Sequence, residues 1–338
     1  MRRPCFSDAR FWFLLAALLL FLGALIVPPA RQEAKAIDVL FTVDITGSMN
    51  TRDYTENGQP VSRLTHIKSV LGQTLADMPC QSRVGLALFA ERRIFLLFEP
   101  VEVCANFAPI MGAVSALDWR EGWEGDSHIA DGLYRAVALA SDLHSDLVFM
   151  TDGQEAPPLP WSGGPAFDGK PGAVKGLVTG VGAYALSPIP KYDNSGREIG
   201  FYGEGDVLQE SRFGIPPPDA VNRPGYNPRN APFGDVQVNN NEHLSSVREP
   251  YLKSLAQKTG MAYTHLSAAQ DFIDALRMHS SGHPVSVWVS RGPAMAALGL
   301  FCLACVYAFL PLFLWLRTQG WWQRRMPSLP IVIRSVAR

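Results

Sequence analysis

Residues 37–43 form the run that most constrains the fold, because apolar side chains occupy nearly every one of its positions (IDVLFTV). A strand with one face in water alternates apolar and polar residues. A nearly continuous apolar run is instead typical of a strand buried on both faces of a mostly parallel sheet. Runs of the same kind recur at 146–151 and 173–181. The chain is therefore predicted to hold an α/β domain with helices on both faces of its sheet.

Stretches with helical periodicity separate these strands. In residues 62–77, Leu64, Ile67 and Leu71 recur at helical spacing and form one apolar stripe. The same reasoning predicts helices at 106–117, 127–143, 242–259 and 268–278, a hairpin at 83–98 and a strand at 261–266, with Gly260 ending the helix before that strand. This alternation predicts a doubly wound, mostly parallel, Rossmann-like sheet, and it favours one domain over two.

Residues 187–242 interrupt the pattern. Pro, Gly and Asn are dense there and no apolar period survives, which predicts a long inserted loop. Its aromatic residues Tyr192, Phe201, Tyr202 and Tyr226 are candidate contacts for a partner protein. The alternative is that the insertion is a flexible decoration without a role.

Apolar segments lie near both ends of the chain, at 11–27 and 293–316, and arginines flank each of them on the side of the chain terminus. The first is at the short limit for crossing a membrane, and the second is long enough. Positive charge stays on the cytoplasmic side, so both termini are expected in the cytoplasm and the region between them in the periplasm of a bacterium. The expected layout is a tail, signal-anchor helix and linker at 1–36, an exported domain at 37–291, a second membrane helix at 292–316 and a basic tail at 317–338.

A cleaved signal peptide is the alternative for residues 1–36. Ala34-Lys35-Ala36 has the small-x-small form that signal peptidase needs. The charged stretch 31–35 lengthens the gap after the apolar run and counts against cleavage. Neither alternative changes the placement of the central domain.

Cys80 and Cys104 are the two cysteines of the expected exported region. They bracket the predicted hairpin, whose outer ends would lie close together. In an oxidising compartment they can form a disulfide, and otherwise they are two buried thiols. Cys302 and Cys305 fall in the second apolar segment, where small residues are typical of a helix-packing face.

Oxygen-bearing side chains follow two of the predicted buried strands. Asp44, Thr46 and Ser48 come directly after the first strand, and Asp152 follows the strand at 146–151. Ligands of open α/β sheets bind where the carboxyl ends of the strands meet. Carboxylate and hydroxyl oxygens suit a hard divalent cation, Mg²⁺ foremost, with Ca²⁺ and Mn²⁺ as alternatives. The competing interpretation is that Asp44 and Ser48 only cap a turn.

These residues make the sequence resemble the von Willebrand factor A (VWA) family. Its metal-ion-dependent adhesion site (MIDAS) combines Asp-x-Ser-x-Ser with a Thr from a second loop and an Asp from a third. Residues 44–48 match the first element, with Thr46 in place of the first Ser, and Asp152 of Thr-Asp-Gly matches the third. The resemblance implies the VWA fold and a metal whose open position is filled by a carboxylate from a partner protein.

The second element of the motif is less direct. Aligning the chain on Gly132 puts Ser127 at the position of the family's Thr, with Asp126 and Asp131 as nearby alternatives. We therefore expect Ser127 to be a metal ligand. The domain could also keep the fold without holding metal.

Binding is expected rather than catalysis. The sequence has no Gly-x-Ser-x-Gly elbow, no phosphate-binding loop and no Cys–His arrangement at supporting spacing, so an enzyme is not expected. The net charge of −1, without a basic stripe in the expected exported domain, argues against nucleic acid as a partner.

Two bacterial groups have the expected layout, the Bat-type aerotolerance proteins and the MxaL-like accessory proteins of methanol oxidation. FTVDITGSMNTRDY, MPCQSRVGLALFAERRIFLLFEPVEVC and FMTDGQEAPPL resemble the MxaL-like group more, over most of residues 37–186. That resemblance implies a periplasmic partner such as methanol dehydrogenase, a quinoprotein whose maturation or metal loading the chain would assist. The Bat-type alternative implies an envelope stress anchor whose tail, with Trp321-Trp322-Gln323-Arg324-Arg325, docks a cytoplasmic MoxR-type ATPase.

Overall fold

The computed structural model describes residues 9–122, 125–160, 163–207, 216–229, 231–234, 241–312 and 315. The chain divides into two compact units, Ala34–Val285 and a second that combines Met1–Glu33 with Ser286–Arg338. Cys5 and the basic C-terminal tail at 317–338 lie outside the described residues.

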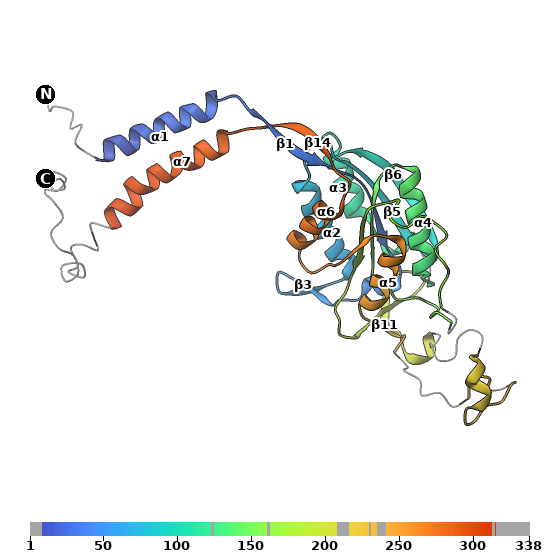
Figure 1. The fold of residues 1–338 in the computed structure, drawn as a ribbon. Helices are drawn as coiled ribbons and strands as arrows, with labels where there is room; N and C mark the ends of the chain where they lie inside the picture. The colour runs from blue at the N-terminus through green and yellow to red at the C-terminus, as the bar shows by residue number, and fades with distance from the viewer. Residues whose placement is uncertain are drawn as a thin grey trace, which may run out of the picture. The chain divides into compact units, whose positions relative to one another are not determined.

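A six-stranded sheet forms the centre of the larger unit (Figure 1). Its strand order is β13-β8-β7-β2-β5-β6. Its strands are β2 (Asp38–Asp44), β5 (Arg83–Ala90), β6 (Arg93–Glu102), β7 (Asp146–Thr151), β8 (Gly176–Gly180) and β13 (Ala262–His265). Neighbouring strands are parallel except β6, which pairs antiparallel with β5 in the predicted hairpin. β7 and β8 are buried throughout. The prediction of an α/β domain with a mostly parallel sheet is confirmed.

Helices cover both faces of this sheet and enclose two apolar cores. The helices are α2 (Arg63–Asp77), α3 (Phe107–Ala116), α4 (Ile129–Asp142), α5 (Glu249–Thr259) and α6 (Ala269–His279). Ile67 of α2 and Phe272 of α6 belong to one core, and α3 adds Ile110. Leu133 of α4 and Leu255 of α5 belong to the other. The sheet is therefore doubly wound, with a core on each face.

Local signals set the ends of two of these helices. The Ser62 side chain accepts a hydrogen bond from the Thr65 backbone N–H and so caps the start of α2. Gly260 follows α5 in the left-handed conformation, with φ of 74°, which favours glycine. The sequence-based placement of that helix end is correct.

The start of α5 differs from the expectation. The sequence predicts a helix from 242, but α5 begins at Glu249, directly before Pro250, a residue suited to the first turn of a helix. Residues before it form β12 (Leu244–Ser245), which pairs with β9 (Ser187–Pro188). A two-residue strand is too short to leave a period in the sequence.

The inserted segment also carries short elements that the sequence did not predict. In its described parts, β10 (Pro190–Tyr192) and β11 (Glu198–Phe201) pair antiparallel, followed by 3₁₀ helices η3 (Glu204–Asp206) and η5 (Pro218–Asn222). Near the start of the domain, 3₁₀ helix η1 (Gly47–Asn50) precedes the hairpin of β3 (Tyr54–Glu56) and β4 (Gln59–Val61). A further 3₁₀ helix, η2 (Trp119–Glu121), follows α3.

Two apolar helices belong to the smaller unit, α1 (Ala9–Ile26) and α7 (Gly292–Ala304), which pack against each other. α7 continues through a π-helical turn at Cys305–Phe309, so the helical stretch Gly292–Leu312 has 21 residues, and an 18-residue window within it has a mean hydropathy of 2.2. Among the described residues, this is the one helix long and apolar enough to cross a membrane, and Arg10–Ile26 is shorter. The structure thus supports one of the two predicted membrane helices.

A two-stranded sheet joins β1 (Ala30–Ala36) to β14 (His283–Val289). From the sequence, residues 30–36 were expected to be part of a linker, and 283–289 were placed in the exported domain without a predicted strand. The pairing connects segments about 250 residues apart, and such long-range partners leave no local signal in the sequence.

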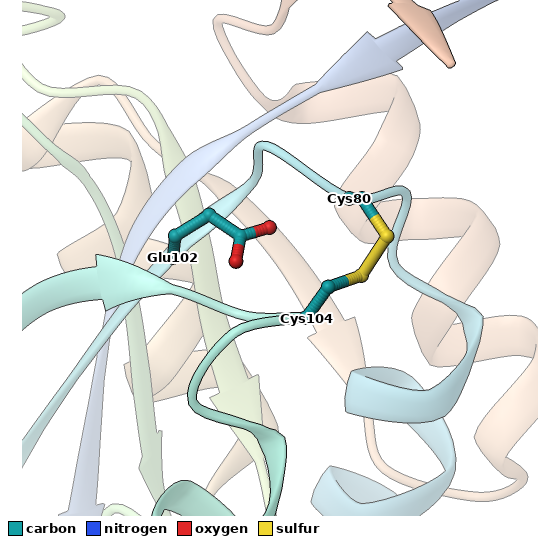
Figure 2. Close-up of side chains that lie close together, drawn as sticks. All are labelled: Cys80, Glu102 and Cys104. Atoms are coloured by element: carbon teal, nitrogen blue, oxygen red, sulfur yellow. A yellow bond between two sulfur atoms is a disulfide. The ribbon is translucent and has the colours of Figure 1, made fainter. Parts of the chain in front are cut away.

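Cys80 and Cys104 form a disulfide, and Glu102 lies beside it (Figure 2). The three side chains are close enough to hold one ion. Cysteine binds metal as a thiolate, and sulfurs bonded to each other offer none. Backbone N–H groups of Ala105 and Gln81 donate to Glu102 and lower its pKa. The cluster is therefore a crosslink with a locally satisfied carboxylate.

Candidate metal centre

The predicted metal-binding residues meet at the carboxyl edge of the sheet. β2 ends at Asp44, and its parallel neighbour β7 ends at Thr151, directly before Asp152. Asp44 and Asp152 are both fully buried. Because β2 and β7 are adjacent and parallel, their ends bring together two carboxylates that are about a hundred residues apart in the sequence.

Three hydrogen bonds hold the Asp44 carboxylate. Its Oδ1 accepts from the Thr46 backbone N–H at 2.9 Å and from Thr46 Oγ1 at 2.7 Å, while its Oδ2 accepts from Thr151 Oγ1 at 2.6 Å. Burial, followed by repulsion from Asp152, nevertheless raises the pKa of Asp44 to about 7. Burial therefore makes Asp44 harder to ionise than an exposed aspartate, and a bound cation would offset this effect.

Asp152 is bound to a buried arginine. Its Oδ2 accepts from Arg63 Nη1 at 2.7 Å and from Ser245 Oγ at 2.7 Å, and its Oδ1 accepts from the Gln154 backbone N–H at 3.0 Å. The Arg63 side chain is fully buried and also pairs with Asp53 at 2.6 Å. The guanidinium therefore joins the start of α2 to the end of β7 and to β12.

Arg63 was not among the site residues predicted from the sequence, although its position on α2 carries a signal. Arg63 lies four residues before Ile67, on the apolar stripe of α2, where a charged residue is unexpected. A buried arginine requires anionic partners, so its position pointed toward the carboxylates. Gly182, with φ of 110°, leaves room for it, because a Cβ there would lie 2.6 Å from Arg63 Cζ.

Ser127 lies in a short bridge just before α4, as expected of a ligand from a second loop. It pairs with Glu91 on one side and Ala156 on the other. Its Oγ is buried and has no hydrogen-bond partner within the part of the chain that the structure describes. Of the two alternatives, Asp126 is exposed and Asp131 is half-buried in the first turn of α4. A hydroxyl that binds a metal ion would be buried and without a hydrogen-bond partner when no ion is bound, as Ser127 Oγ is here.

The charges of the site also fit a divalent cation. Three buried carboxylates, Asp44, Asp53 and Asp152, face one guanidinium, that of Arg63. Two negative charges would remain uncompensated with every carboxylate ionised, and a doubly charged cation would balance them. Thr46 is buried and Ser48 half-buried on the loop after β2, so their hydroxyls are available as further oxygen ligands.

A cavity of about 440 Å³ lies over this edge. Thr46, Ser48 and Ser127 line it, and the inserted segment contributes Pro190, Tyr192 and Tyr202 to the lining. Two of the four aromatic residues proposed as partner contacts, Tyr192 and Tyr202, therefore line the cavity. The other two, Phe201 and Tyr226, are not among its lining residues.

Contacts with the rest of the domain hold this part of the inserted segment in place. The Tyr192 ring lies 4.6 Å from the Trp119 ring, centroid to centroid. On β11, Glu198 pairs with Arg52, which lies just beyond η1 on the segment that follows β2. The insertion is thus attached to the domain beside the candidate metal centre.

Residues 39–154 match the family model of the von Willebrand factor type A domain. No curated protein sequence matches the chain. One similar solved structure is an aerotolerance-related membrane protein from Bacteroides fragilis, with 15% identity and a TM-score of 0.44, covering 72% of this chain and 98% of that one. Another is the conserved hypothetical protein BatB from Bacteroides thetaiotaomicron, with 14% identity and a TM-score of 0.45, covering 72% of this chain and 96% of that one. A third is an uncharacterised membrane-spanning protein from Vibrio fischeri, with 16% identity and a TM-score of 0.27, covering 71% of this chain and 96% of that one. All three TM-scores are below 0.5, so the family match over residues 39–154 is the comparison that bears on this chain.

Proposed function

We propose that the von Willebrand factor A-type domain of this chain binds a partner protein through a divalent cation held by Asp44, Thr46, Ser48, Ser127 and Asp152. The observation that carries the proposal is the unpartnered, buried Oγ of Ser127, which lines the same cavity as Thr46 and Ser48, at the sheet edge where Asp44 is buried against Asp152. When bound, the cation would supply positive charge to which an Asp or Glu of the partner can bind. Mg²⁺ is the proposed ion because all five ligands offer oxygen, with Ca²⁺ and Mn²⁺ as alternatives.

The chain's own residues would orient this site. Arg63 holds Oδ2 of Asp152, and Thr151 holds Oδ2 of Asp44, so neither carboxylate can rotate freely. The surrounding wall of the cavity limits how a partner can approach. We propose binding rather than catalysis, because neither the motifs nor these contacts supply a nucleophile with a paired base.

Isothermal titration of the full chain in detergent with MgCl₂ tests the metal site. Ser127→Ala removes one ligand and is expected to weaken Mg²⁺ binding about tenfold, because similar losses follow from perturbing metal-ligand sets. Asp44→Ala is expected to abolish binding. Ser115→Ala, on an exposed position of α3, is the matched control and should bind as the wild type does. Unchanged Mg²⁺ affinity in Ser127→Ala and Asp44→Ala would refute the site.

We further propose that the domain lies in the bacterial periplasm, anchored in the inner membrane, with both termini in the cytoplasm. The support is the apolar helix at Gly292–Leu312, the flanking arginines and the Cys80–Cys104 disulfide, since disulfides persist in oxidising compartments. A cleaved N-terminal segment stays an alternative for residues 1–36. Reporter fusions after residues 36 and 290 would separate the topologies.

The partner we propose is a periplasmic protein of the methanol dehydrogenase system, whose maturation or metal loading the chain would assist. The support is the resemblance of residues 37–186 to MxaL-like proteins. The alternative is a Bat-type envelope anchor that works with a cytoplasmic MoxR-type ATPase. Purification of the full chain from its native membrane, with Mg²⁺ present, distinguishes them by what co-purifies, a dehydrogenase in one case and an ATPase in the other. Co-purification unchanged by Asp44→Ala would contradict a metal-bridged contact.

A further inference from the structure

The backbone around Ser127 is held by the segment that follows Asp152. The Ser127 N–H donates to the Ala156 carbonyl oxygen at 2.6 Å, and the Ala156 N–H donates to the Ser127 carbonyl oxygen at 2.8 Å. On the other side, the His128 N–H donates to the Glu91 carbonyl oxygen at 2.6 Å. Backbone contacts on two sides therefore fix the loop that carries Ser127.

A buried carboxylate of the same segment holds the first turn of α4, which begins two residues after Ser127. Glu155 is 9% exposed, and its two oxygens accept from the backbone N–H groups of Ile129 and Ala130, each at 3.0 Å. The first N–H groups of a helix have no acceptor within the helix, and the N-cap residue of α4, His128, makes no side-chain cap bond. Glu155 therefore caps α4 from a different loop.

The start of α5 holds Glu155 in turn. The Tyr251 hydroxyl, in the first turn of α5, donates to Glu155 Oε1. The backbone N–H of Arg248, the N-cap residue of α5, donates to the Asp152 carbonyl oxygen at 2.8 Å. Residues 152–156 are thus attached to α5 near both ends, and they contact the loop before α4 as well as α4 itself.

We propose that Glu155 is a positioning residue of the metal centre, which sets the place of Ser127 relative to Asp152 by joining the segment after Asp152 to the start of α4. This inference rests on the proposed metal site. Three donors occupy the two oxygens of Glu155, so it acts through Ser127 rather than as a ligand. Metal sites require ligand distances within about 0.2 Å, so a small displacement of the α4 start weakens binding.

Removal of the carboxylate tests this role. Glu155→Ala leaves two N–H groups of α4 without their acceptor. Isothermal titration of the full chain in detergent should then show Mg²⁺ binding weakened about tenfold, as is typical when a residue that orients a metal ligand is lost. Glu155→Gln keeps one acceptor oxygen, so it should weaken binding less than Glu155→Ala does.

Combination with Ser127→Ala separates positioning from a general loss of structure. If Glu155 acts through Ser127, Glu155→Ala should weaken Mg²⁺ binding by no more than about twofold in the Ser127→Ala background, because the ligand that it positions is already absent. A merely structural role would weaken binding by the same factor in both backgrounds. Equal factors would contradict the proposal, and so would wild-type affinity in a folded Glu155→Ala chain.

Tyr251→Phe is a milder change that keeps the test decisive if Glu155→Ala does not fold. It removes one donor to Glu155, and it should weaken Mg²⁺ binding in the wild-type background alone. Tyr134→Phe is the matched control, because Tyr134 lies on α4 but its hydroxyl donates to the Pro165 carbonyl oxygen. Equal Mg²⁺ affinities of the two variants would then contradict the proposal.

Amide hydrogen exchange in EDTA gives a readout that needs no metal. The N–H groups of Ile129 and Ala130 should exchange faster in Glu155→Gln than in the wild type, while those in the centre of α4 should not. Unchanged exchange at these two positions would show that Glu155 does not hold the start of α4.

The outcomes separate this inference from the proposed function. If the wild type does not bind Mg²⁺, the proposed function is wrong, and the positioning role with it. If the wild type binds Mg²⁺ and Asp44→Ala does not, but Glu155→Ala acts equally in both backgrounds, the metal site stands and this inference alone is wrong.

Discussion

The position of Asp44 in the fold opposes the ionisation of its carboxyl group. The end of β2 places its carboxylate in the interior beside Asp152, and the hydrogen bonds from Thr46 and Thr151 compensate only part of the cost. Arg63 balances one charge of this group, but it pairs with Asp152 and Asp53 rather than with Asp44. A buried pair of this kind organises the site more than it stabilises the fold.

The pH dependence of stability without metal follows from Asp44. Its pKa of about 7 in the folded state is above its value of 3.8 in the unfolded chain, so between these pH values the folded state binds more protons. The free energy of unfolding is therefore expected to fall as pH rises from about 4 to about 7, and to level off above. Urea unfolding in EDTA at several pH values measures this.

Asp44→Asn is the comparison that isolates the effect. Its amide does not titrate, so the part of the pH dependence due to residue 44 should disappear. The wild type should lose stability relative to the variant as pH rises through this window. Parallel curves for the two proteins would show that Asp44 ionises in the folded state as it does in the unfolded chain.

At the scale of elements, close packing of α4 on the sheet depends on Gly132. A Cβ at this position would lie 2.1 Å from Phe89 Cε2, inside the ring's van der Waals surface. Gly112 of α3 is a matched control, because nothing lies within 4 Å of its Cβ position. The same substitution thus meets a packed interface in one helix and open space in the other.

Gly132→Ala is expected to destabilise the domain by about 1–3 kcal/mol, because overpacking outweighs the gain in helix propensity. Gly112→Ala should stabilise it, by up to about 1 kcal/mol. Urea unfolding of both variants gives the two changes. Equal effects at the two positions would mean that α4 does not pack against Phe89 as closely as described.

For the whole molecule, the two cores and the candidate metal centre lie inside one of the two units, Ala34–Val285. The long apolar helix lies in the other. Residues 30–290 are therefore expected to fold without the apolar helices, since they keep both cores, the disulfide and the β1–β14 pairing.

That fragment should be soluble, unfold cooperatively in urea and bind Mg²⁺ with the affinity of the full chain. The full chain should stay with membranes during alkaline extraction. Circular dichroism, titration and fractionation test these expectations. An insoluble fragment, or release of the full chain at alkaline pH, would contradict this division of roles.

Much of the fold could be predicted from the sequence because its cause is local. β2, β7 and β8 must be apolar along their length to be buried on both faces, and α2 and α4 must carry one apolar stripe, so each leaves a pattern in consecutive residues. The loop residues Asp44 and Asp152 could be found in the same way, since they follow those strands directly. Sequence alone thus determined the sheet and the edge at which its polar residues meet.

The tertiary structure decided the features that depend on partners far along the chain. Arg63 contacts Asp152 and Ser245 across 89 and 182 residues, and residues of the inserted segment line the cavity at the candidate metal centre. Gln154 Nε2 likewise donates to the Glu242 carbonyl across 88 residues. Such contacts form because the sheet brings distant loops to one edge, and no periodicity in consecutive residues records them.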